Sequence, residues 1–445
     1  MSRIVIEGAH VATLDPARRE FTGHVVAEGN RLVAAGPGPA PAYDDARVVD
    51  GRGCLVTPGF VNTHQHLYQW VTRGLAADAT LFEWLTTLYP VWARITPETV
   101  YVAARAALAQ LALTGCTTVA DHHYVFPGGD LLAAEIQAAS EIGLRFHPAR
   151  GSMDRGQKDG GLPPDSVVED RDTILTATED AIDRWHDPSS DAMLQIVVAP
   201  CSPFSVSGEL MRESAELARR RGVRLHTHLA ETTDETSWCR ETYGCTPLEY
   251  ADQLGWTGPD VWFAHGIHFD DAEIKHLGGT GTGVAHCPSS NARLGAGIAR
   301  TADLRAAGSP VGLGVDGAAS NESGSLVEEL RHALLFARAR GGPQALTVRD
   351  TLEMATLDGA RILGRSDDIG SLEPGKLADL ALWDLTGLPH AGIPDPVVAL
   401  TLSTPPPLAL LLTNGRPVVE HAVLQTADPA ALATDVARTQ AGLLL

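Results

Sequence analysis

An apolar run ends in two histidines at Cys54-Leu55-Val56-Thr57-Pro58-Gly59-Phe60-Val61-Asn62-Thr63-His64-Gln65-His66. The run predicts a buried strand, and residues two apart on a strand project from the same face. His64 and His66 can therefore bind one metal ion together. A single pair at this spacing is also compatible with two imidazoles that only hydrogen-bond inside a core. The rest of the chain decides between these two interpretations.

Three further stretches carry a ligand-type side chain at the point where an apolar, strand-like run ends. They are residues 224–231 with His228, residues 262–266 with His265, and residues 311–317 with Asp316. Such coincidences are not expected by chance in one chain. The pattern indicates a metal-dependent hydrolytic enzyme.

Short apolar runs alternate with longer amphipathic stretches from residue 55 onward. We expect strands at 55–63, 116–121, 144–150, 194–199, 223–228, 261–265, 283–287 and 310–316. Helical patterns lie between them, at 97–114, 131–142, 168–186, 207–221 and 270–278. Strands that alternate with helices in this way predict an α/β fold, a parallel (β/α)₈ TIM-like barrel.

The two ends of the chain have β-rich patterns instead. Asn414-Gly415 separates two apolar runs, which is a strong hairpin signal. Each end is too short to bury a β core alone, so we expect one small β-sandwich built from both. The predicted domains are 1–57 (first part of the sandwich), 58–371 (catalytic barrel) and 372–445 (second part and C-terminal tail).

Composition limits the partners and the compartment. Hydrophobic residues make up 44% and charged residues 20%, as in a globular protein with a large core. The formal charge of -21 argues against a nucleic-acid backbone or an anionic membrane as partner. No run approaches the roughly 18 apolar residues that a spanning helix needs. The six scattered cysteines predict a reduced, cytoplasmic protein, and without a C-x-x-C motif the small zinc-deaminase fold is excluded.

The active site of a parallel barrel gathers at the carboxyl ends of its strands. The expected metal ligands are His64, His66, His228 and Asp316, whose three nitrogens and one oxygen suit Zn²⁺ or Fe²⁺. The metal would lower the pKa of a bound water toward about 7 and make it a nucleophile. Asp316 is also compatible with a helix N-cap.

Two further residues are catalytic candidates. Glu231 follows His228 by three residues and can carry a proton to a substrate ring nitrogen. His265 ends its strand and can aim a nitrogen at the attacking water. The end of the fourth strand, at Val198-Ala199-Pro200-Cys201, has no lysine that could bridge two metals. A single divalent metal per chain is therefore expected.

These residues resemble the signatures of the amidohydrolase superfamily, in its mononuclear aminohydrolase branch. Pro58–His66 is similar to the family's first-strand motif and His228–Glu231 to its fifth-strand motif. Four loops resemble those of bacterial 8-oxoguanine deaminases: 88–93, 120–127, 200–205 and 285–291. The resemblance implies hydrolysis of 8-oxoguanine to urate and ammonia, with Asp316 accepting the proton of water, Glu231 protonating the ring and His265 polarising the attacking group.

The resemblance also suggests substrate contacts. Gln69 matches a base-binding glutamine of guanine deaminases, whereas Cys201 stands in a segment where those enzymes carry an Arg-Phe pair. His123, with its neighbours His122 and Tyr124, follows the second strand and is a candidate for the pocket lining. Arg150 could meet a substrate carbonyl or a structural carboxylate. Trp70, Trp84 and Trp92 belong to a long excursion that could form a lid or pack within itself.

Two alternatives remain at this point. The same architecture could act on isoxanthopterin, guanine or an amino-s-triazine. A non-catalytic barrel is the remote alternative, which is disfavoured because no ligand and no acid is missing. In each catalytic case the partner is a small purine-like molecule, not a nucleic-acid polymer or a membrane. We also expect a homo-oligomer.

Overall fold

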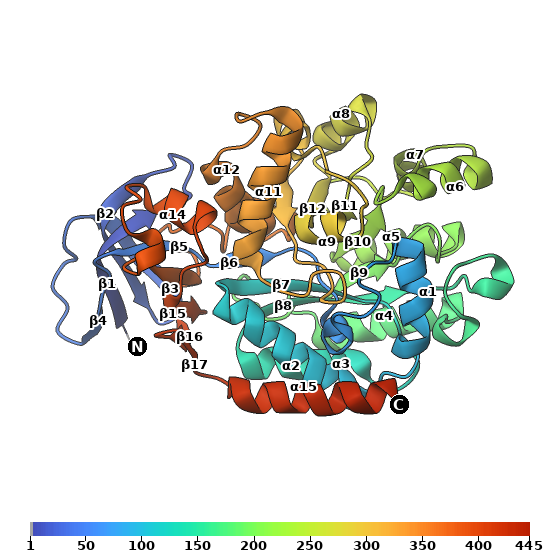
Figure 1. Ribbon diagram of the computed structural model, residues 1–445, viewed down its shortest axis with the longest axis horizontal. Coiled ribbons are helices and arrows are strands. Elements are labelled where there is room, and N and C mark those ends of the chain that lie inside the picture. The colour runs from blue at the N-terminus through green and yellow to red at the C-terminus, as the bar shows by residue number, and fades with distance from the viewer. Residues whose placement is uncertain (1–2) are drawn as a thin grey trace.

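The computed structural model describes residues 3–445 and contains two β-sheets, one near an end of the long axis and the other in the middle of the molecule (Figure 1). One is an eight-stranded parallel sheet surrounded by helices. The other is a nine-stranded mixed sheet built from both ends of the chain. The expected fold class is confirmed. No helix among the described residues is both long and apolar enough to cross a membrane.

The parallel sheet is a nearly closed barrel whose strands follow one another in chain order. Its strands are β6 (Phe60–Asn62), β7 (Cys116–His123), β8 (Arg145–Ser152), β9 (Val197–Pro200), β10 (Arg224–Leu229), β11 (Val261–His265), β12 (Gly283–His286) and β13 (Val311–Leu313). The backbone N–H of Thr63 donates to Leu313 O over 2.9 Å, across the seam between the first and last strands. All eight carboxyl ends therefore meet at one mouth.

The predicted helices are present, and their ends follow from local capping. Asp130 accepts a hydrogen bond from Ala133 N at the start of α3, and Gly143 ends that helix at a φ of 86°. The helices are α1 (Leu81–Trp92), α2 (Pro97–Leu113), α3 (Leu131–Ile142), α4 (Arg171–Trp185), α5 (Gly208–Arg221), α6 (Thr233–Tyr243), α7 (Pro247–Gln253), α8 (Asp271–Thr280), α9 (Pro288–Arg293), α10 (Thr301–Ala307), α11 (Leu326–Gly341), α12 (Val348–Glu353), α13 (Gly359–Ile362), α14 (Pro396–Leu402) and α15 (Pro429–Leu444).

The strand expected at 55–63 is divided between the two sheets. Its first part is β5 (Cys54–Pro58), which pairs with β1 and β14 in the mixed sheet, and its second part is β6 in the barrel. The chain changes sheet at Gly59, where a Cβ would lie 2.2 Å from Thr117 Oγ1. Only glycine allows this close approach of the chain to β7, so the apolar run is continuous but the strand is not.

The mixed sheet joins the two ends of the chain in the order β17-β16-β15-β14-β5-β1-β2-β3, with β4 paired to β1. Its remaining strands are β1 (Arg3–Ala12), β2 (Glu20–Glu28), β3 (Arg31–Pro37), β4 (Ala46–Asp50), β14 (Leu380–Asp384), β15 (Leu408–Thr413), β16 (Arg416–Glu420) and β17 (Val423–Leu424). Asn414 and Gly415 have φ of 51° and 73° and connect β15 to β16, so the predicted hairpin is confirmed. The predicted domain boundaries stay a prediction.

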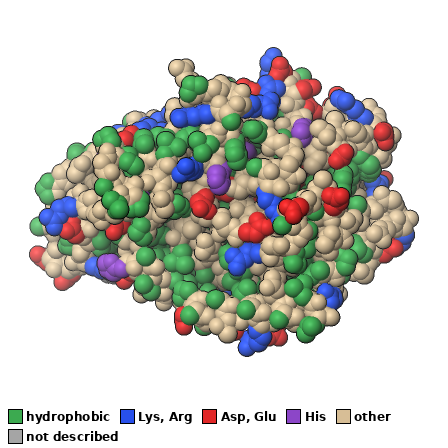
Figure 2. Space-filling model, in the orientation of Figure 1, with side chains coloured by type: hydrophobic (Ala, Val, Ile, Leu, Met, Phe, Trp, Pro, Cys, Tyr) green, Lys and Arg blue, Asp and Glu red, His purple; other side chains and the backbone are tan. Residues whose placement is uncertain are grey.

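The C-terminal tail is a helix, which the sequence pattern did not predict. Helix α15 lies along α2, and its Leu432 and Leu443 are buried (Figure 1). Acidic and basic side chains are interspersed on the face of the molecule in Figure 2.

A buried ion pair connects the barrel to the mixed sheet. Arg145 Nε, at the start of β8, donates to Asp379 Oδ2 over 3.0 Å, and both side chains are at most 1% exposed. Arg145 also donates to the backbone oxygens of Asp191 and Ala192, and Asp379 Oδ1 accepts from Asn414 N. The pair is therefore fully hydrogen-bonded on both sides.

Removal of one partner from this pair should destabilise the whole protein. We expect Asp379→Asn to lower the free energy of unfolding by about 3–5 kcal/mol, because it leaves the Arg145 guanidinium buried without its counter-charge. Denaturant titration followed by circular dichroism measures the effect. Asp435→Asn, which breaks the exposed Arg438–Asp435 pair, is the matched control and should change stability little. Equal effects of the two substitutions would contradict the role of Arg145–Asp379.

Candidate metal centre and active site

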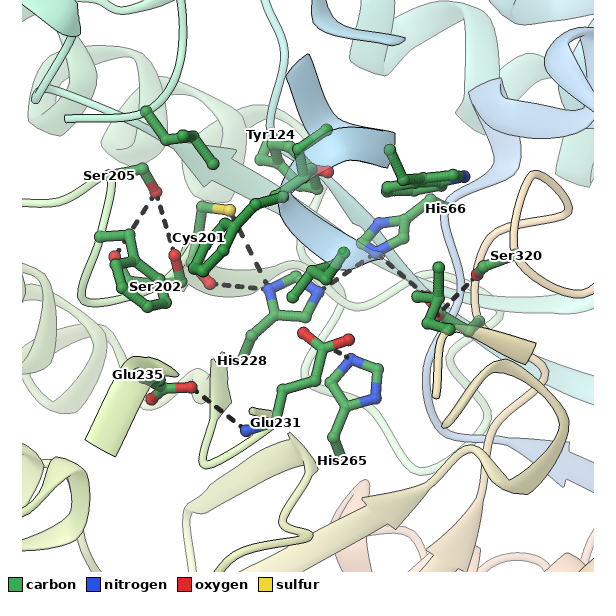
Figure 3. Close-up of a pocket in the computed structure, with 18 of the residues that line it drawn as sticks. His66, Tyr124, Cys201, Ser202, Ser205, His228, Glu231, Glu235, His265 and Ser320 are labelled. Carbon is green, nitrogen blue, oxygen red and sulfur yellow. Dashed lines mark hydrogen bonds and ion pairs between the residues drawn. The ribbon is translucent and has the colours of Figure 1, made fainter. Parts of the chain in front are cut away.

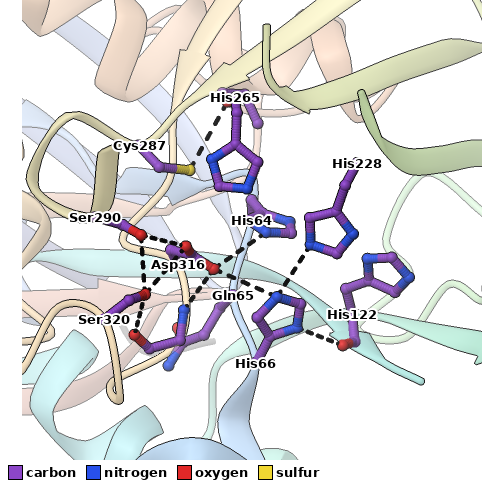
Figure 4. Close-up of polar contacts among 12 residues, drawn as sticks. His64, Gln65, His66, His122, His228, His265, Cys287, Ser290, Asp316 and Ser320 are labelled. Carbon is purple, nitrogen blue, oxygen red and sulfur yellow. Dashed lines mark hydrogen bonds and ion pairs between the residues drawn. The ribbon is translucent and has the colours of Figure 1, made fainter. Parts of the chain in front are cut away.

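The expected metal ligands and catalytic residues meet at the mouth of the barrel. Figure 3 labels His66, His228, Glu231 and His265, and Figure 4 adds His64 and Asp316. His64 and His66 follow β6, His228 lies near the end of β10, His265 ends β11, and Asp316 follows β13. All five side chains are buried. Residues that are more than 250 positions apart in sequence, such as His64 and Asp316, lie within 3.3 Å of each other here.

Main-chain carbonyls orient two of the imidazoles. His66 Nδ1 donates to His122 O over 2.6 Å, and His228 Nδ1 donates to Cys201 O over 2.7 Å. Burial and neighbouring imidazoles lower the pKa of His66 to about 3 and that of His228 well below its usual value. Each ring is thus neutral and carries its proton on Nδ1. The two Nε2 atoms, 3.2 Å apart, face each other as bare lone pairs.

Two more electron-rich atoms complete the cluster. His64 Nε2 is buried without a hydrogen-bond partner. It lies 3.3 Å from Asp316 Oδ1, and the same oxygen lies 3.3 Å from His66 Nε2. Three bare nitrogens and a carboxylate oxygen repel one another unless a cation lies between them. The residues present therefore fit a divalent metal ion with an N₃O donor set.

Hydroxyl groups hold the carboxylate of Asp316 in place (Figure 4). Its Oδ2 accepts from Ser290 Oγ over 2.6 Å and from Ser320 Oγ over 3.2 Å. Its Oδ1 accepts from Gly317 N over 2.7 Å. Burial alone would raise the pKa of Asp316, but the neighbouring imidazoles of His64, His265 and His66 hold it well below the usual range. The carboxylate is ionised.

Glu231 and His265 form the second half of the site. Glu231 Oε2 lies 3.7 Å from His265 Nε2, and His265 Nδ1 donates to Asn291 Oδ1 over 2.9 Å. Burial raises the pKa of Glu231 above its usual value. Burial would lower the pKa of His265, but the charges of Glu231 and Asp316 raise it. Glu231 therefore keeps its proton to a higher pH than an exposed glutamate does, which suits a residue that transfers a proton.

His265 is also near enough to the candidate metal ligands to be considered as one of them. Ring nitrogens of His64, His228 and His265 lie within 4.8 Å of one another. The imidazole of His265 stacks on that of His228, with ring centroids 5.5 Å apart. Its hydrogen bond to Asn291 and its carboxylate neighbours distinguish it from the three bare imidazoles.

The backbone is strained where these strands end. Ala230, His265 and Asp316 have φ of 55°, 72° and 62°, in the left-handed region that non-glycine residues rarely adopt. Glu235 supports the first of these turns, because its carboxylate accepts hydrogen bonds from the backbone N–H groups of Ala230 and Glu231 over 3.0 and 3.1 Å. This turn directs the Glu231 side chain into the pocket.

The pocket in front of the cluster has an aromatic and acidic lining. Helix α1 and the loop after β9 face each other across it, and Phe82 packs edge-on against Phe204 with ring centroids 5.2 Å apart. No Lys or Arg is among the residues that line it in the described part of the chain. Of the tryptophans in the long segment after the first barrel strand, Trp84 lines the pocket. Trp92 is fully buried and packs against Tyr68.

Of the four residues suggested as substrate contacts, Gln69, His123, Arg150 and Cys201, only Cys201 lines this pocket. Gln69 is fully buried, and neither atom of its amide has a hydrogen-bond partner. Both ring nitrogens of His123 are engaged, with Glu135 Oε1 and Val125 O. Arg150 pairs with the carboxylate of Glu169 over 2.8 Å. Of the two partners expected from the sequence, a substrate carbonyl or a structural carboxylate, the structure shows the carboxylate.

Several site residues were missed in the sequence. Glu235, Ser290, Asn291 and Ser320 support catalytic side chains, and His226 contacts His64. The only available signal was position: Glu235 lies four residues after Glu231, and Ser290 and Asn291 lie just past the seventh barrel strand. Tyr124 also lines the pocket, as the sequence suggested for the segment after the second strand.

Comparisons with known proteins agree with this geometry. The model of the Amidohydrolase family matches residues 55–418. An 8-oxoguanine deaminase of Pseudomonas aeruginosa is 49% identical over 92% of each chain, and an isoxanthopterin deaminase of an unknown prokaryotic organism is 37% identical over 89% of this chain and 87% of its own.

The solved structures that resemble the fold include a zinc enzyme. The atrazine chlorohydrolase TrzN from Arthrobacter aurescens, complexed with zinc, is 33% identical, with a TM-score of 0.94 over 98% of this chain and 100% of that one. The family match covers most of the chain, and both curated relatives exceed 30% identity. This protein therefore belongs to the amidohydrolase family.

Proposed function

We propose that this protein is a metal-dependent aminohydrolase that converts 8-oxoguanine to urate and ammonia. The observation that carries the proposal is the convergence of the Nε2 atoms of His64, His66 and His228 with Asp316 Oδ1, beside the buried acid Glu231. These four residues are the proposed ligands, and zinc is the proposed metal, as in the similar triazine-degrading enzyme. Fe²⁺ would also fit the donor set.

Each residue around the proposed metal ligands has its own role in the proposed reaction. A divalent cation bound there supplies Lewis-acid activation of the attacking water. Asp316 is ionised and accepts the proton of that water. Glu231, with its raised pKa, gives a proton to the ring nitrogen next to the amino-bearing carbon. His265 is held by Asn291 and polarises the attacking group. Asp316 then passes its proton to the amino group, the C–N bond breaks and ammonia leaves. The hydroxyl proton returns to Glu231 as the C=O bond of the product forms.

The character of the pocket supports a planar, uncharged ring as substrate. Aromatic side chains of Phe82, Trp84, Tyr124 and Phe204 surround the space, and no Lys or Arg side chain lines it in residues 3–445. A phosphate or carboxylate group on the substrate would therefore find no Lys or Arg to pair with. A free base fits this pocket better than a nucleotide does.

Two observations support 8-oxoguanine among the related rings: sequence identity to a relative, and the absence of an arginine just after β9. The relative described as an 8-oxoguanine deaminase is 49% identical, against 37% for the isoxanthopterin deaminase. Cys201 and Ser202 follow β9 and line the pocket, so no arginine faces the substrate from this strand end. Isoxanthopterin, guanine and amino-s-triazines are the alternative substrates. A cytoplasmic location and a homo-oligomeric state stay predictions from the sequence.

The first prediction concerns the metal. We expect one equivalent of divalent metal per chain in freshly purified protein, and His66→Ala should abolish both metal and activity because it removes one of the converging donors. Elemental analysis and ammonia release measure the two effects. His276→Ala, at an exposed histidine, is the control and should retain both. Two equivalents of metal, or full activity after chelation, would contradict the proposed centre.

The second prediction concerns Glu231. Glu231→Gln keeps the shape of the side chain but removes the transferable proton, so kcat should fall at least ~10²-fold. Metal content should be unchanged, because Glu231 is not a proposed ligand. Glu241→Gln, on the exposed side of α6, is the matched control. Near-native turnover by Glu231→Gln would show that the proton comes from another group.

The third prediction concerns the substrate. The value of kcat/KM for 8-oxoguanine should exceed that for guanine by about 10⁴-fold, as in pockets that hydrogen-bond a group which the analogue lacks. Ammonia release across 8-oxoguanine, guanine, isoxanthopterin and an amino-s-triazine measures this preference. If guanine or a triazine is turned over as efficiently, the substrate assignment is wrong, although the aminohydrolase assignment stands.

A further inference from the structure

Another imidazole, that of His226, lies next to the proposed metal ligands and contacts one of them directly. His64 Nδ1 and His226 Nε2 are 2.8 Å apart, and His226 Nδ1 is 2.9 Å from Trp262 O. His226 is 2% exposed and lies on β10, two residues before His228. These contacts form a continuous chain from the main chain of β11 to His64.

The direction of each hydrogen bond in this chain follows from chemistry. A carbonyl oxygen only accepts, so the proton of neutral His226 is on Nδ1 and points to Trp262 O. Its Nε2 is then a bare lone pair. The short contact with His64 can form only if His64 Nδ1 is the donor. His64 must therefore carry its proton on Nδ1, and its Nε2 is left bare toward Asp316.

The surroundings leave His64 no other arrangement. His122 Nε2 donates to Ala199 O over 2.8 Å, so the other nitrogen of His122 is also bare, and it has no hydrogen-bond partner. Ring nitrogens of His64, His122 and His226 lie within 4.8 Å of one another. The Nδ1–H of His64 thus faces acceptors only. His66 and His228, in contrast, donate to main-chain carbonyls.

We propose that His226 is a positioning residue of the metal centre, whose bare Nε2 fixes the tautomer and ring orientation of His64 so that His64 Nε2 is available to a divalent cation. This inference rests on the proposed role of His64 as a metal ligand. It assigns the task that a main-chain carbonyl performs for His66 and His228 to a side chain. A side chain can be substituted, so the task can be tested directly.

Two substitutions separate this role from simple packing. His226 stacks on Trp262 with ring centroids 4.4 Å apart and an interplanar angle of 18°. His226→Phe keeps an aromatic ring against Trp262 but removes the acceptor. His226→Gln loses the stacking but can present an amide oxygen close to the position of Nε2. A packing role predicts that Gln is the harmful substitution, whereas the proposal predicts that Phe is.

The readout is the affinity of the apo-protein for Zn²⁺, measured by competition with a chromophoric chelator. We expect His226→Phe to raise the dissociation constant by about 10–100-fold, the usual effect of losing such a supporting hydrogen bond. His226→Gln should stay much closer to the wild-type value. A Phe variant that binds as tightly as wild type, or a Gln variant that binds as weakly as Phe, would overturn the proposal.

A second measurement needs no folded Phe variant. Long-range ¹H–¹⁵N correlation spectra of the wild-type protein, with the His226 signals identified by their loss in His226→Gln, report which nitrogen carries the proton. The proposal requires the Nδ1-protonated form, and an Nε2-protonated His226 would refute it. If the wild-type protein binds no Zn²⁺ at all, the proposed metal centre itself fails, which is a separate outcome.

Discussion

Mutual repulsion among converging lone pairs is the constraint around which this structure is arranged. The Nε2 atoms of His66 and His228 lie 3.2 Å apart with no proton between them, and Asp316 adds a negative oxygen at 3.3 Å from His66. Such an arrangement is unfavourable without a cation and favourable with one. The backbone nevertheless holds these atoms together. The metal-free protein therefore folds with an unfavourable contact, which a bound metal ion would relieve.

Neighbouring carbonyl and hydroxyl groups hold the converging donor atoms in place. Carbonyls of His122 and Cys201 fix the proton positions of two imidazoles, and hydroxyls of Ser290 and Ser320 fix the carboxylate. Left-handed backbone at His265 and Asp316 places these side chains where an ordinary strand end would not. The barrel tolerates this strain because its strands are continuously paired below the mouth.

Much of the site could be predicted because it depends on strand ends. His64, His66, His228, His265 and Asp316 each follow an apolar run, and parallel strands of a barrel bring their carboxyl ends together whatever the loops do. Substrate contacts were less predictable. His123 and Arg150 lie near strand ends too, but their partners, Glu135 and Glu169, are found only in the folded chain. A side chain that is satisfied by such a partner is not free to meet a ligand.

The sequence by itself determined the order of the barrel strands, the joining of both chain ends in one sheet, and the set of donors, because hydrophobic periodicity and residue type are local properties. Only the tertiary structure decided where β5 ends and β6 begins and how α15 packs on α2. It also decided which nitrogen of His64 faces the other proposed metal ligands. The last depends on a hydrogen bond to His226, 162 residues away in the chain. Proton positions are set by partners in space, and no spacing along the sequence encodes them.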